Sequence, residues 1–444
     1  MTDEELTALT AIEAAEHIAN GDFSSEEYVG ACLDRIAAID GEVRAFVHLD
    51  PDAALAQARE VDERRRNGLS IGLLHGLPVA IKDLFDTADY KTEYGTALFR
   101  GRQPARDSAV VARLREAGAV IIGKTVTTEL AYFSPGPTRN PHDLTRTPGG
   151  SSSGSAAAVA AAMVPLAVGS QTNGSMIRPA SFCGVYGVKP THGLISRHGA
   201  LELSRSLDHV GVFARSLADA ALILEVLAGY DPNDPDTRPV AAPDYLGLVA
   251  EEPPLPPRLA FVRTPVWDKA DAQTHAAFEE LVTALGDRIA EVALPDAYAA
   301  AWDDQRVIMA ADMAHNFDPL LKRGGGDVLS QQMRDLLADG CAVPAVRYLD
   351  AQRNARGYAA GLMKMFDEYD AILTPATPGI APVGEATGSP VFNTLWSLTG
   401  LPALTLPLLA GEGGMPLGVQ LVGAKGDDAR LFRTANWLVE QLEE

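Results

Sequence analysis

The chain has 444 residues, of which 47% are hydrophobic and 6% aromatic, and its formal net charge at pH 7 is -22. This length fits one large α/β domain or about two or three smaller ones, and length alone does not choose between them. The negative charge repels phosphate backbones, so we expect no nucleic-acid partner, and the commoner consequence of such a charge is solubility.

The first half of the chain predicts helices followed by buried strands. Apolar residues recur at helical spacing in the N-terminal part, and Ser24 and Ser25 have the character of a helix cap. In chain order, the predicted elements are helices over 5–66, a buried strand over 76–81, a helix over 110–118, a buried strand over 119–122 and an extended loop over 134–150. The predicted strand over 76–81 delivers Lys82 and Asp83 at its end.

The second half continues the alternation of strands and helices, and no internal repeat is evident. The predicted elements are a helix over 216–228, a proline-rich surface connection over 230–258, a strand over 259–262, a mainly helical region over 272–365 with polar breaks around Gly324–Gly326, a strand over 369–375, paired strands over 402–409 and 418–422, and a closing helix over 427–442. Strands separated by helices throughout predict an α/β fold in which helices cover a mixed sheet.

Cysteines and targeting signals are uninformative. The chain has three cysteines, Cys32, Cys183 and Cys341. Their spacing predicts neither a disulfide framework nor a zinc site, so each is expected to be a small buried side chain. The acidic N-terminus lacks the pattern of a signal peptide, and the apolar run 156–168 is too short to span a bilayer. These features predict a soluble cytoplasmic protein with no membrane partner.

Two glycine- and serine-rich loops, Gly149–Ser155 and Gly169–Ser175, flank an alanine-rich run in the middle of the chain. Glycine lets the backbone approach a ligand closely and adopt positive φ. A helix or turn that starts after such a loop presents unpaired N–H groups, which suit an oxyanion. The central stretch therefore predicts a site that stabilises negative charge on oxygen.

Three motif matches in this chain point to other chemistry. Gly118–Thr125 fits the phosphate-loop pattern, but its intervening residues are predicted to form a buried strand. Val79–Lys82 spells a kinase strand signature without the other kinase motifs. Gly150–Gly154 fits G-x-S-x-G with Ser152 as nucleophile, although nothing strand-like precedes it and no histidine stands in a diagnostic context. The Ser152 interpretation stays open as a minor alternative.

A serine hydroxyl is a weak nucleophile and needs a base, and Lys82 is the candidate. A lysine with its ordinary pKa of about 10.4 is useless as a base at pH 7 unless burial or its neighbours lower that pKa. Lys82 ends an apolar strand, which suits this role. A snorkelling lysine paired with Asp83 is an equally good interpretation of the spacing alone. The nine histidines include no HExxH motif, and we expect no metal and no cofactor.

Several motifs together strongly resemble the amidase signature family. The matching segments are Gly149–Ser155, Gly169–Ser175, Ile177–Ala180, Leu74–Asp83, Gly123–Thr125 with Thr128–Glu129, Thr145–Pro148, Thr374–Pro378, Gly400–Pro402 and Leu417–Leu421. The resemblance covers nearly the whole chain and is weakest over 230–365. It implies one large α/β/α domain over 1–444 with a mixed, twisted sheet. Its predicted parts are N-terminal helices (1–70), a catalytic core (71–230), a variable, mainly helical region (231–365) and closing strands and a helix (366–444).

The resemblance also implies a Ser–cisSer–Lys triad. Ser175 would be the nucleophile, Ser151 the bridging serine on a cis peptide bond and Lys82 the general base. The backbone N–H groups of Thr172, Asn173, Gly174 and Ser175 would hold the oxyanion. Substrate binding or support of the loops is expected of Arg178, Tyr132, Gly149 and Gly150, and for Arg178 support is the favoured role.

The chain departs from the family pattern at three positions. Gln171 stands where an acidic residue is usual, Asn173 where a small residue is usual, and Ser153 where glycine is common. The Gln171 side chain makes the surroundings of the loop more neutral, and the Asn173 side chain can narrow the site or add a donor. None of these departures removes a member of the implied triad.

The resemblance implies a serine hydrolase that cleaves the C–N bond of small amides or carbamates, as an amidase or a urethanase. The alternative is the glutamine-amidase subunit of a tRNA-dependent amidotransferase, which needs a partner subunit. A third hypothesis, a catalytically inactive interaction protein, is disfavoured by the intact Lys82, Ser151 and Ser175. A small-molecule substrate is the expected partner, and a homodimer is expected only because dimers are common.

Overall fold

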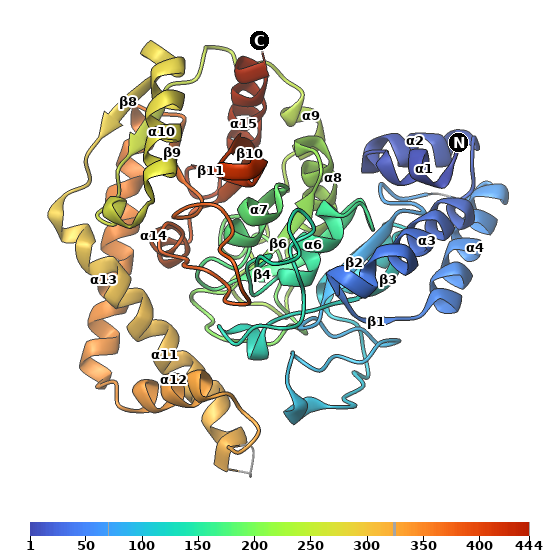
Figure 1. Cartoon of the computed structure of the whole chain (residues 1–444), viewed down its shortest axis with the longest axis horizontal. Helices are drawn as coiled ribbons and strands as arrows, with labels where there is room; N and C mark the ends of the chain where they lie inside the picture. Colours follow the sequence, from blue (N-terminus) through green and yellow to red (C-terminus); the bar gives the residue numbers. More distant parts are fainter. Residues whose placement is uncertain (70, 323–325, 444) are drawn as a thin grey trace.

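A single mixed β-sheet organises the molecule. A computed structural model describes residues 1–69, 71–322 and 326–443. Within these residues, eleven strands form one sheet in the order β1-β3-β2-β4-β6-β5-β10-β11-β9-β7-β8. Helices flank this sheet, as Figure 1 shows. The predicted α/β fold with a mixed sheet flanked by helices is therefore confirmed. The division of residues 1–444 into four segments stays a prediction, and Ser70 and Glu444 at two of its boundaries lie outside the described residues.

The N-terminal part is helical with one exception. Its elements are α1 (Asp3–Ala8), α2 (Ala11–Asn20), α3 (Ser25–Val43), β1 (Phe46–Leu49) and α4 (Pro51–Arg66). Ser24 caps α3, and its hydroxyl accepts a hydrogen bond from the Glu27 N–H. The prediction of helices over the whole of 5–66 was wrong at β1, which pairs antiparallel with β3 at the edge of the sheet. A four-residue edge strand is stabilised by its distant partner and leaves too short a pattern to recognise.

The central segment alternates strands and helices. Its elements are β2 (Pro78–Lys82), α5 (Ala109–Glu116), β3 (Val120–Thr125), α6 (Ser153–Ala160), β4 (Leu166–Gln171), α7 (Ile177–Cys183), β5 (Tyr186–Lys189), β6 (His209–Ala214) and α8 (Leu217–Leu227). β2 lies parallel to both β3 and β4. Parallel strands end at the same edge of a sheet, so the residues after β2 and β4 come together there.

The C-terminal half completes the sheet and adds a helical layer. Its elements are α9 (Tyr245–Val249), β7 (Leu259–Val262), α10 (Ala272–Leu285), β8 (Ile289–Val292), α11 (Ala301–Leu320), α12 (Gln331–Cys341), α13 (Ala345–Met363), β9 (Ala371–Pro375), α14 (Thr394–Thr399), β10 (Ala403–Ala410), β11 (Pro416–Val422) and α15 (Asp428–Glu443). Short 3₁₀ helices lie at Ala97–Phe99, Glu129–Ala131, Trp267–Lys269, Gly286–Arg288, Asp296–Ala300, Lys364–Asp367 and Glu412–Gly414.

Three details of this half correct the sequence predictions. α9 forms inside the stretch 230–258, which was predicted as a surface connection, because Asp244 caps it through the Gly247 N–H. β8 interrupts the region predicted as mainly helical, because it pairs in parallel with β7. Cys32 and Cys183 are buried as predicted, but Cys341 at the end of α12 is exposed. The predicted polar break around 324–326 lies mostly outside the described residues.

The arrangement of these layers explains where a site can form. In Figure 1, α1–α4 (blue) lie on one side of the molecule and α11–α13 (gold to orange) on the other, with α6 and α7 between them. α11 packs against α12, α13 and α14.

Among the residues that the structure describes, no helix has both the length and the apolar composition needed to cross a membrane. The cytoplasmic location stays a prediction.

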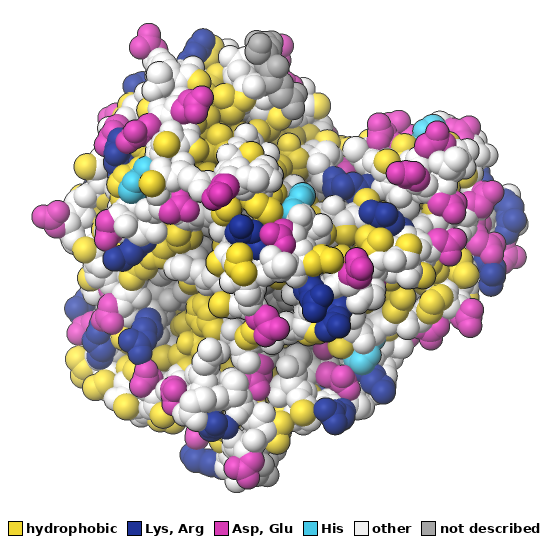
Figure 2. Space-filling model, viewed as in Figure 1, with side chains coloured by type: hydrophobic (Ala, Val, Ile, Leu, Met, Phe, Trp, Pro, Cys, Tyr) yellow, Lys and Arg dark blue, Asp and Glu magenta, His cyan; other side chains and the backbone are white. Residues whose placement is uncertain are grey.

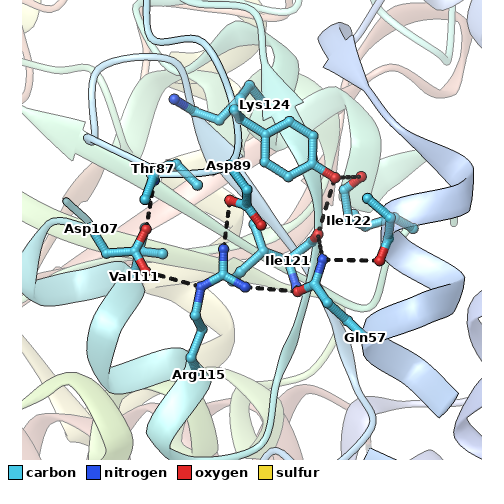
Figure 3. Close-up of polar contacts among 12 residues, drawn as sticks. Gln57, Thr87, Asp89, Asp107, Val111, Arg115, Ile121, Ile122 and Lys124 are labelled. Carbon is cyan, nitrogen blue, oxygen red and sulfur yellow. Dashed lines mark hydrogen bonds and ion pairs between the residues drawn. The ribbon is translucent and has the colours of Figure 1, made fainter. Parts of the chain in front are cut away.

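Polar side chains tie α4 and α5 to the central sheet, as Figure 3 shows. Gln57 Nε2 donates to the Ile121 carbonyl at 3.3 Å, and Gln57 Oε1 accepts from the Ile121 N–H at 3.2 Å. The Arg115 guanidinium donates to Gln57 Oε1 at 2.8 Å and pairs with Asp107 and Asp89. This cluster fixes the helices that cover β3 and, through β3, the position of β2.

The buried pair Lys124–Asp83 rules out the phosphate-loop interpretation of Gly118–Thr125. Lys124 belongs to the fully buried strand β3, and its Nζ lies 3.2 Å from Asp83 Oδ1. The same ammonium donates to the Phe85 carbonyl at 2.9 Å and to Thr92 Oγ1 at 2.6 Å. The amine is saturated by protein groups, as a structural lysine requires.

We predict that Lys124→Ala strongly destabilises the fold, because the Asp83 carboxylate would stay buried without its cation. The expected loss is about 3–5 kcal/mol in the free energy of unfolding, measured by urea denaturation. Lys364→Ala is the matched control, since Lys364 is exposed, and it should change stability by less than about 0.5 kcal/mol. Equal stability of the two variants would contradict the assigned role of the buried pair.

Candidate active site

Three segments bring the predicted triad to one edge of the sheet. Lys82 is the last residue of β2, and Ser151 precedes α6. Ser175 lies in the loop that joins β4 to α7. The parallel pairing of β2 and β4 places the end of each strand at this edge, and α6 packs against both strands.

The Lys82 amine lies in a cage of serine hydroxyls. Its Nζ is 2.7 Å from Ser151 Oγ, 3.0 Å from Ser152 Oγ and 2.9 Å from Ser170 Oγ. The side chain is 0% exposed. Asp83, the partner proposed for a snorkelling Lys82, pairs instead with Lys124. That alternative is therefore wrong.

Burial lowers the pKa of the Lys82 ammonium well below its ordinary value. The Asp208 carboxylate opposes this decrease, and the Arg178 guanidinium adds to it. The three hydrogen-bond partners are neutral hydroxyls, which stabilise an ammonium much less than a carboxylate in contact would. The site thus disfavours the charged form of the amine relative to a lysine in water.

Arg178 on α7 holds the loop that carries Ser151. The Gly150–Ser151 peptide bond is cis. The Arg178 guanidinium donates to the Gly150 carbonyl at 2.5 Å and to the Gly388 carbonyl at 3.0 Å. Burial lowers the pKa of Arg178 to about 9. These contacts match the expected supporting role of Arg178 and join the loop to residues near 388.

Gly149 belongs to this loop, and Tyr132 is linked to Arg178 through the Phe133 ring. The Tyr132 ring meets the Phe133 ring edge-on, with centroids 4.9 Å apart. The Arg178 guanidinium lies over the Phe133 ring at 5.6 Å. Gly149 has φ of +84°, and a Cβ there would lie 2.9 Å from the Pro179 Cα. Only glycine fits this close approach of the loop to α7.

The Ser175 side chain is 8% exposed, and it follows Gly174 in a tight loop. In the described part of the chain, its hydroxyl makes no hydrogen bond, so the link from Ser151 to Ser175 is not formed in this state. Hydrogen bonds between catalytic groups are often long in unliganded enzymes and tighten with substrate bound. The structure thus brings Lys82 and Ser151 into contact, and the relay to Ser175 stays a prediction.

Side chains from α11 and α14 hold the carbonyl groups of the loop. Gln305 Nε2 donates to the Thr172 carbonyl at 3.5 Å, and Ser397 Oγ donates to the Asn173 carbonyl at 2.5 Å. A trans peptide unit points its C=O and N–H in opposite directions. The N–H groups of Asn173 and Gly174 therefore point away from α11 and α14. A Cβ on Gly174 would lie 2.4 Å from Asn393 Oδ1, so a larger residue would displace the loop.

Gln171 and Asn173, two of the residues that depart from the family pattern, both form hydrogen bonds through their side-chain amides. Gln171 Oε1 accepts hydrogen bonds from the N–H groups of Met176 at 2.7 Å and Ile177 at 3.0 Å. Asn173 Oδ1 accepts from Thr394 Oγ1 at 2.8 Å, and its Nδ2 donates to Gln305 Oε1 at 3.3 Å. The Asn173 side chain is therefore held by α11 and α14.

Asp208 was not identified from the sequence. It is buried directly before β6, and it accepts from Thr172 Oγ1 at 2.6 Å and from the Leu203 and Ser204 N–H groups. Burial raises the pKa of Asp208 to about 6. A cavity of about 300 Å³ adjoins it and is also lined by Ser170 and Thr172. Asp208 thus links Thr172 of the loop to a cavity that is also lined by Ser170, a hydrogen-bond partner of Lys82.

The geometry argues against Ser152 as the nucleophile. The residues before it are not a strand, and Ser152 directly precedes α6. Its hydroxyl is fully buried and donates to the Ser170 carbonyl at 3.1 Å.

Within residues 1–69, 71–322 and 326–443, no group of three or more His, Cys, Asp or Glu side chains is arranged to hold a metal ion.

A family model described as Amidase matches residues 27–432, which is most of the chain. The chain belongs to the amidase family. A curated relative from Chloroflexus aurantiacus, a subunit of glutamyl-tRNA(Gln) amidotransferase, is 37% identical, and the match covers 97% of this chain and 96% of the relative. Family membership makes this chain a C–N hydrolase, as predicted.

Solved structures of other family members superpose closely on this amidase. One comes from work on a vestigial protein complex and the origins of an s-triazine catabolic enzyme, with a TM-score of 0.91, 33% identity and coverage of 97% and 98% of the two chains. Another is a peptide amidase in complex with the competitive inhibitor chymostatin, with a TM-score of 0.87, 30% identity and coverage of 98% of each chain. These matches confirm the predicted fold.

We predict that the reactivity of Ser175 depends on the lowered pKa of Lys82. The neutral fraction of Lys82 grows as the pH rises through that pKa, so the rate at which a fluorophosphonate modifies Ser175 should rise too. The midpoint should lie well below about 10.4, the ordinary lysine value. The measurement is the modification rate against pH, with Lys82→Ala as the control that loses the rise. A midpoint near the ordinary value would contradict a buried neutral base.

Proposed function

We propose that this amidase hydrolyses the C–N bond of an amide through an acyl-enzyme on Ser175. The observation that carries the proposal is the buried Lys82 amine, 2.7 Å from Ser151 Oγ on the loop that leads to α6. Lys82 is the general base, Ser151 the proton relay and Ser175 the nucleophile.

The reaction proceeds in two steps. Ser175 Oγ attacks the amide carbon, its proton passes to Ser151, and the Ser151 proton passes to Lys82. The tetrahedral intermediate then breaks its C–N bond, and the relay returns a proton to the leaving nitrogen. Water attacks the acyl-enzyme in the second step and releases the acid and the Ser175 hydroxyl.

The backbone of the loop supplies the oxyanion donors. The N–H groups of Met176 and Ile177 are bonded to Gln171, and therefore they do not serve. The N–H groups of Thr172, Asn173, Gly174 and Ser175 remain as the oxyanion donors that we propose. Loss of one such donor typically costs about 10²–10³ in rate.

Among possible amides, the curated relatives favour glutamine. The relative from Chloroflexus aurantiacus is named as a subunit of glutamyl-tRNA(Gln) amidotransferase, which supports the glutamine-amidase alternative better than the small-amide hydrolase. In that setting this chain would release ammonia from the glutamine side chain for a partner subunit. The net charge of -22, and the interspersed acidic and basic side chains on the face shown in Figure 2, indicate that the partner would make most of the RNA contacts.

The second candidate is a hydrolase of small amides or carbamates that acts without a partner. The peptide amidase among the similar structures favours this candidate. A carbamate would use the same acyl-enzyme step, with carbon dioxide lost afterwards. A homodimer and a cytoplasmic location remain expectations for both candidates.

The first prediction for this function concerns the nucleophile. Wild-type protein treated with a fluorophosphonate should gain one adduct by intact-mass spectrometry, and peptide mapping should place it on Ser175. Ser175→Ala should lose both the adduct and all turnover while it keeps its melting temperature.

Two controls sharpen this test. Ser152→Ala should keep the adduct, whereas an adduct on Ser152 would revive the G-x-S-x-G interpretation. EDTA should leave the labelling and the turnover unchanged, because the proposed steps use no metal. Turnover by folded Ser175→Ala would refute the proposed mechanism.

The second prediction separates the two candidate substrates. Ammonia release by the purified chain is measured with L-glutamine, propionamide and benzamide, and amine release with N-phenyl ethyl carbamate. For a glutamine-amidase subunit we expect glutamine to be the preferred substrate and its turnover to rise when the amidotransferase partner is added. Efficient turnover of propionamide or the carbamate by the chain alone, with glutamine untouched, would instead identify a small-molecule hydrolase.

A further inference from the structure

A directed chain of hydrogen bonds runs along the buried side of the nucleophile loop. Gln171 Nε2 donates to Ser397 Oγ at 2.9 Å, and Ser397 Oγ donates to the Asn173 carbonyl at 2.5 Å. Gln171 is the last residue of β4, and Ser397 belongs to α14, 226 residues away along the chain. Both side chains are buried, so water does not replace either contact.

The neutral amide of Gln171 sets the donor-to-acceptor direction of these hydrogen bonds. Its oxygen accepts from the N–H groups of Met176 and Ile177, and its nitrogen donates to Ser397. A serine hydroxyl has a single proton. Because Gln171 supplies the donor to Ser397, the Ser397 proton is available for the Asn173 carbonyl. An ionised carboxylate at position 171 has no donor, and it would compete with that carbonyl for the Ser397 proton.

The Asn173 carbonyl belongs to the same peptide unit as the Gly174 N–H. This unit is trans, since the one cis bond among the described residues is Gly150–Ser151. Ser397 pulls the carbonyl toward α14, and the Gly174 N–H therefore points to the opposite side of the loop. A hydrogen bond to the carbonyl also polarises the N–H of the same unit.

We propose that Gln171 and Ser397 are positioning residues that aim the Gly174 N–H at the oxyanion. This inference rests on the proposed function, because it assigns the alignment of one oxyanion donor to two side chains that touch neither substrate nor Ser175 Oγ. It also explains why glutamine suits position 171. Its amide oxygen holds the loop through the Met176 and Ile177 N–H groups, and its amide nitrogen directs the Ser397 proton to the Asn173 carbonyl.

The experiment measures the second-order rate at which a fluorophosphonate modifies Ser175, together with its pH dependence and the melting temperature. The variants are Ser397→Ala, Ser397→Thr and Gln171→Glu. Thr399→Val is the matched control, since Thr399 is buried on the same helix and its hydroxyl bonds to the Leu395 carbonyl of that helix.

Ser397→Ala should slow the modification about tenfold to a hundredfold, somewhat less than the loss of a whole donor. Its pH midpoint should equal that of the wild type, because the contacts of Lys82 are unchanged. Ser397→Thr keeps the hydroxyl and should restore most of the rate. Gln171→Glu keeps both acceptor contacts, and it should slow the modification by a similar factor. Thr399→Val should stay within about twofold of the wild-type rate.

The outcomes separate this inference from the proposed function. Folded Ser397→Ala or Gln171→Glu with the wild-type rate would overturn the positioning role while the nucleophile assignment stands. A wild-type protein that is not labelled on Ser175 would refute the proposed function itself. If Ser397→Ala does not fold, folded Gln171→Glu carries the same comparison. A slower rate in Thr399→Val equal to that in Ser397→Ala would reduce the effect to loosening of α14, which also overturns the proposal.

Discussion

The burial of one lysine amine among hydroxyl groups is the constraint on which the rest of the site depends. Removing an ammonium from water is unfavourable, and the cage around Lys82 offers three neutral oxygens instead of a carboxylate in contact. Asp83, its neighbour in sequence, is kept away from it by its own pair with Lys124. β2, β4 and the loop before α6 together keep this amine buried among hydroxyl groups, and its burial lowers its pKa.

The other side of the site is the loop after β4, where hydrogen bonds orient the backbone groups. Gln305 and Ser397 hold the carbonyl groups of the loop, and the planarity of each peptide unit turns this hold into an orientation of the N–H groups. Both side chains come from the C-terminal half of the chain, where α11 and α14 pack together. This half therefore completes the site that the central motif begins.

Much of the fold was readable from the sequence, because long apolar patterns give a strong local signal. The predicted strand over 76–81 lies within two residues of β2 at each end. The buried strand over 119–122 was also predicted, but β3 runs three residues further, to Thr125, and includes Lys124. β1, α9 and β8 were missed because they are short elements of four or five residues. A strand such as β1 exists only through its pairing partner, and no local pattern records that partner.

The sequence by itself determined the family, the central glycine- and serine-rich loops, and the residue types proposed for the triad, because these are local features of the chain. Only the tertiary structure decided that Lys82 turns toward Ser151 and away from Asp83, and that Arg178 holds the Gly150 carbonyl. The structure alone also brought Asp208, Gln305 and Ser397 to the loop. These contacts join residues that are tens to hundreds of positions apart along the chain. The packing of β2, β4, α11 and α14 sets the distances between them. Burial and contact distance are properties of that packing, and they determine the pKa of Lys82.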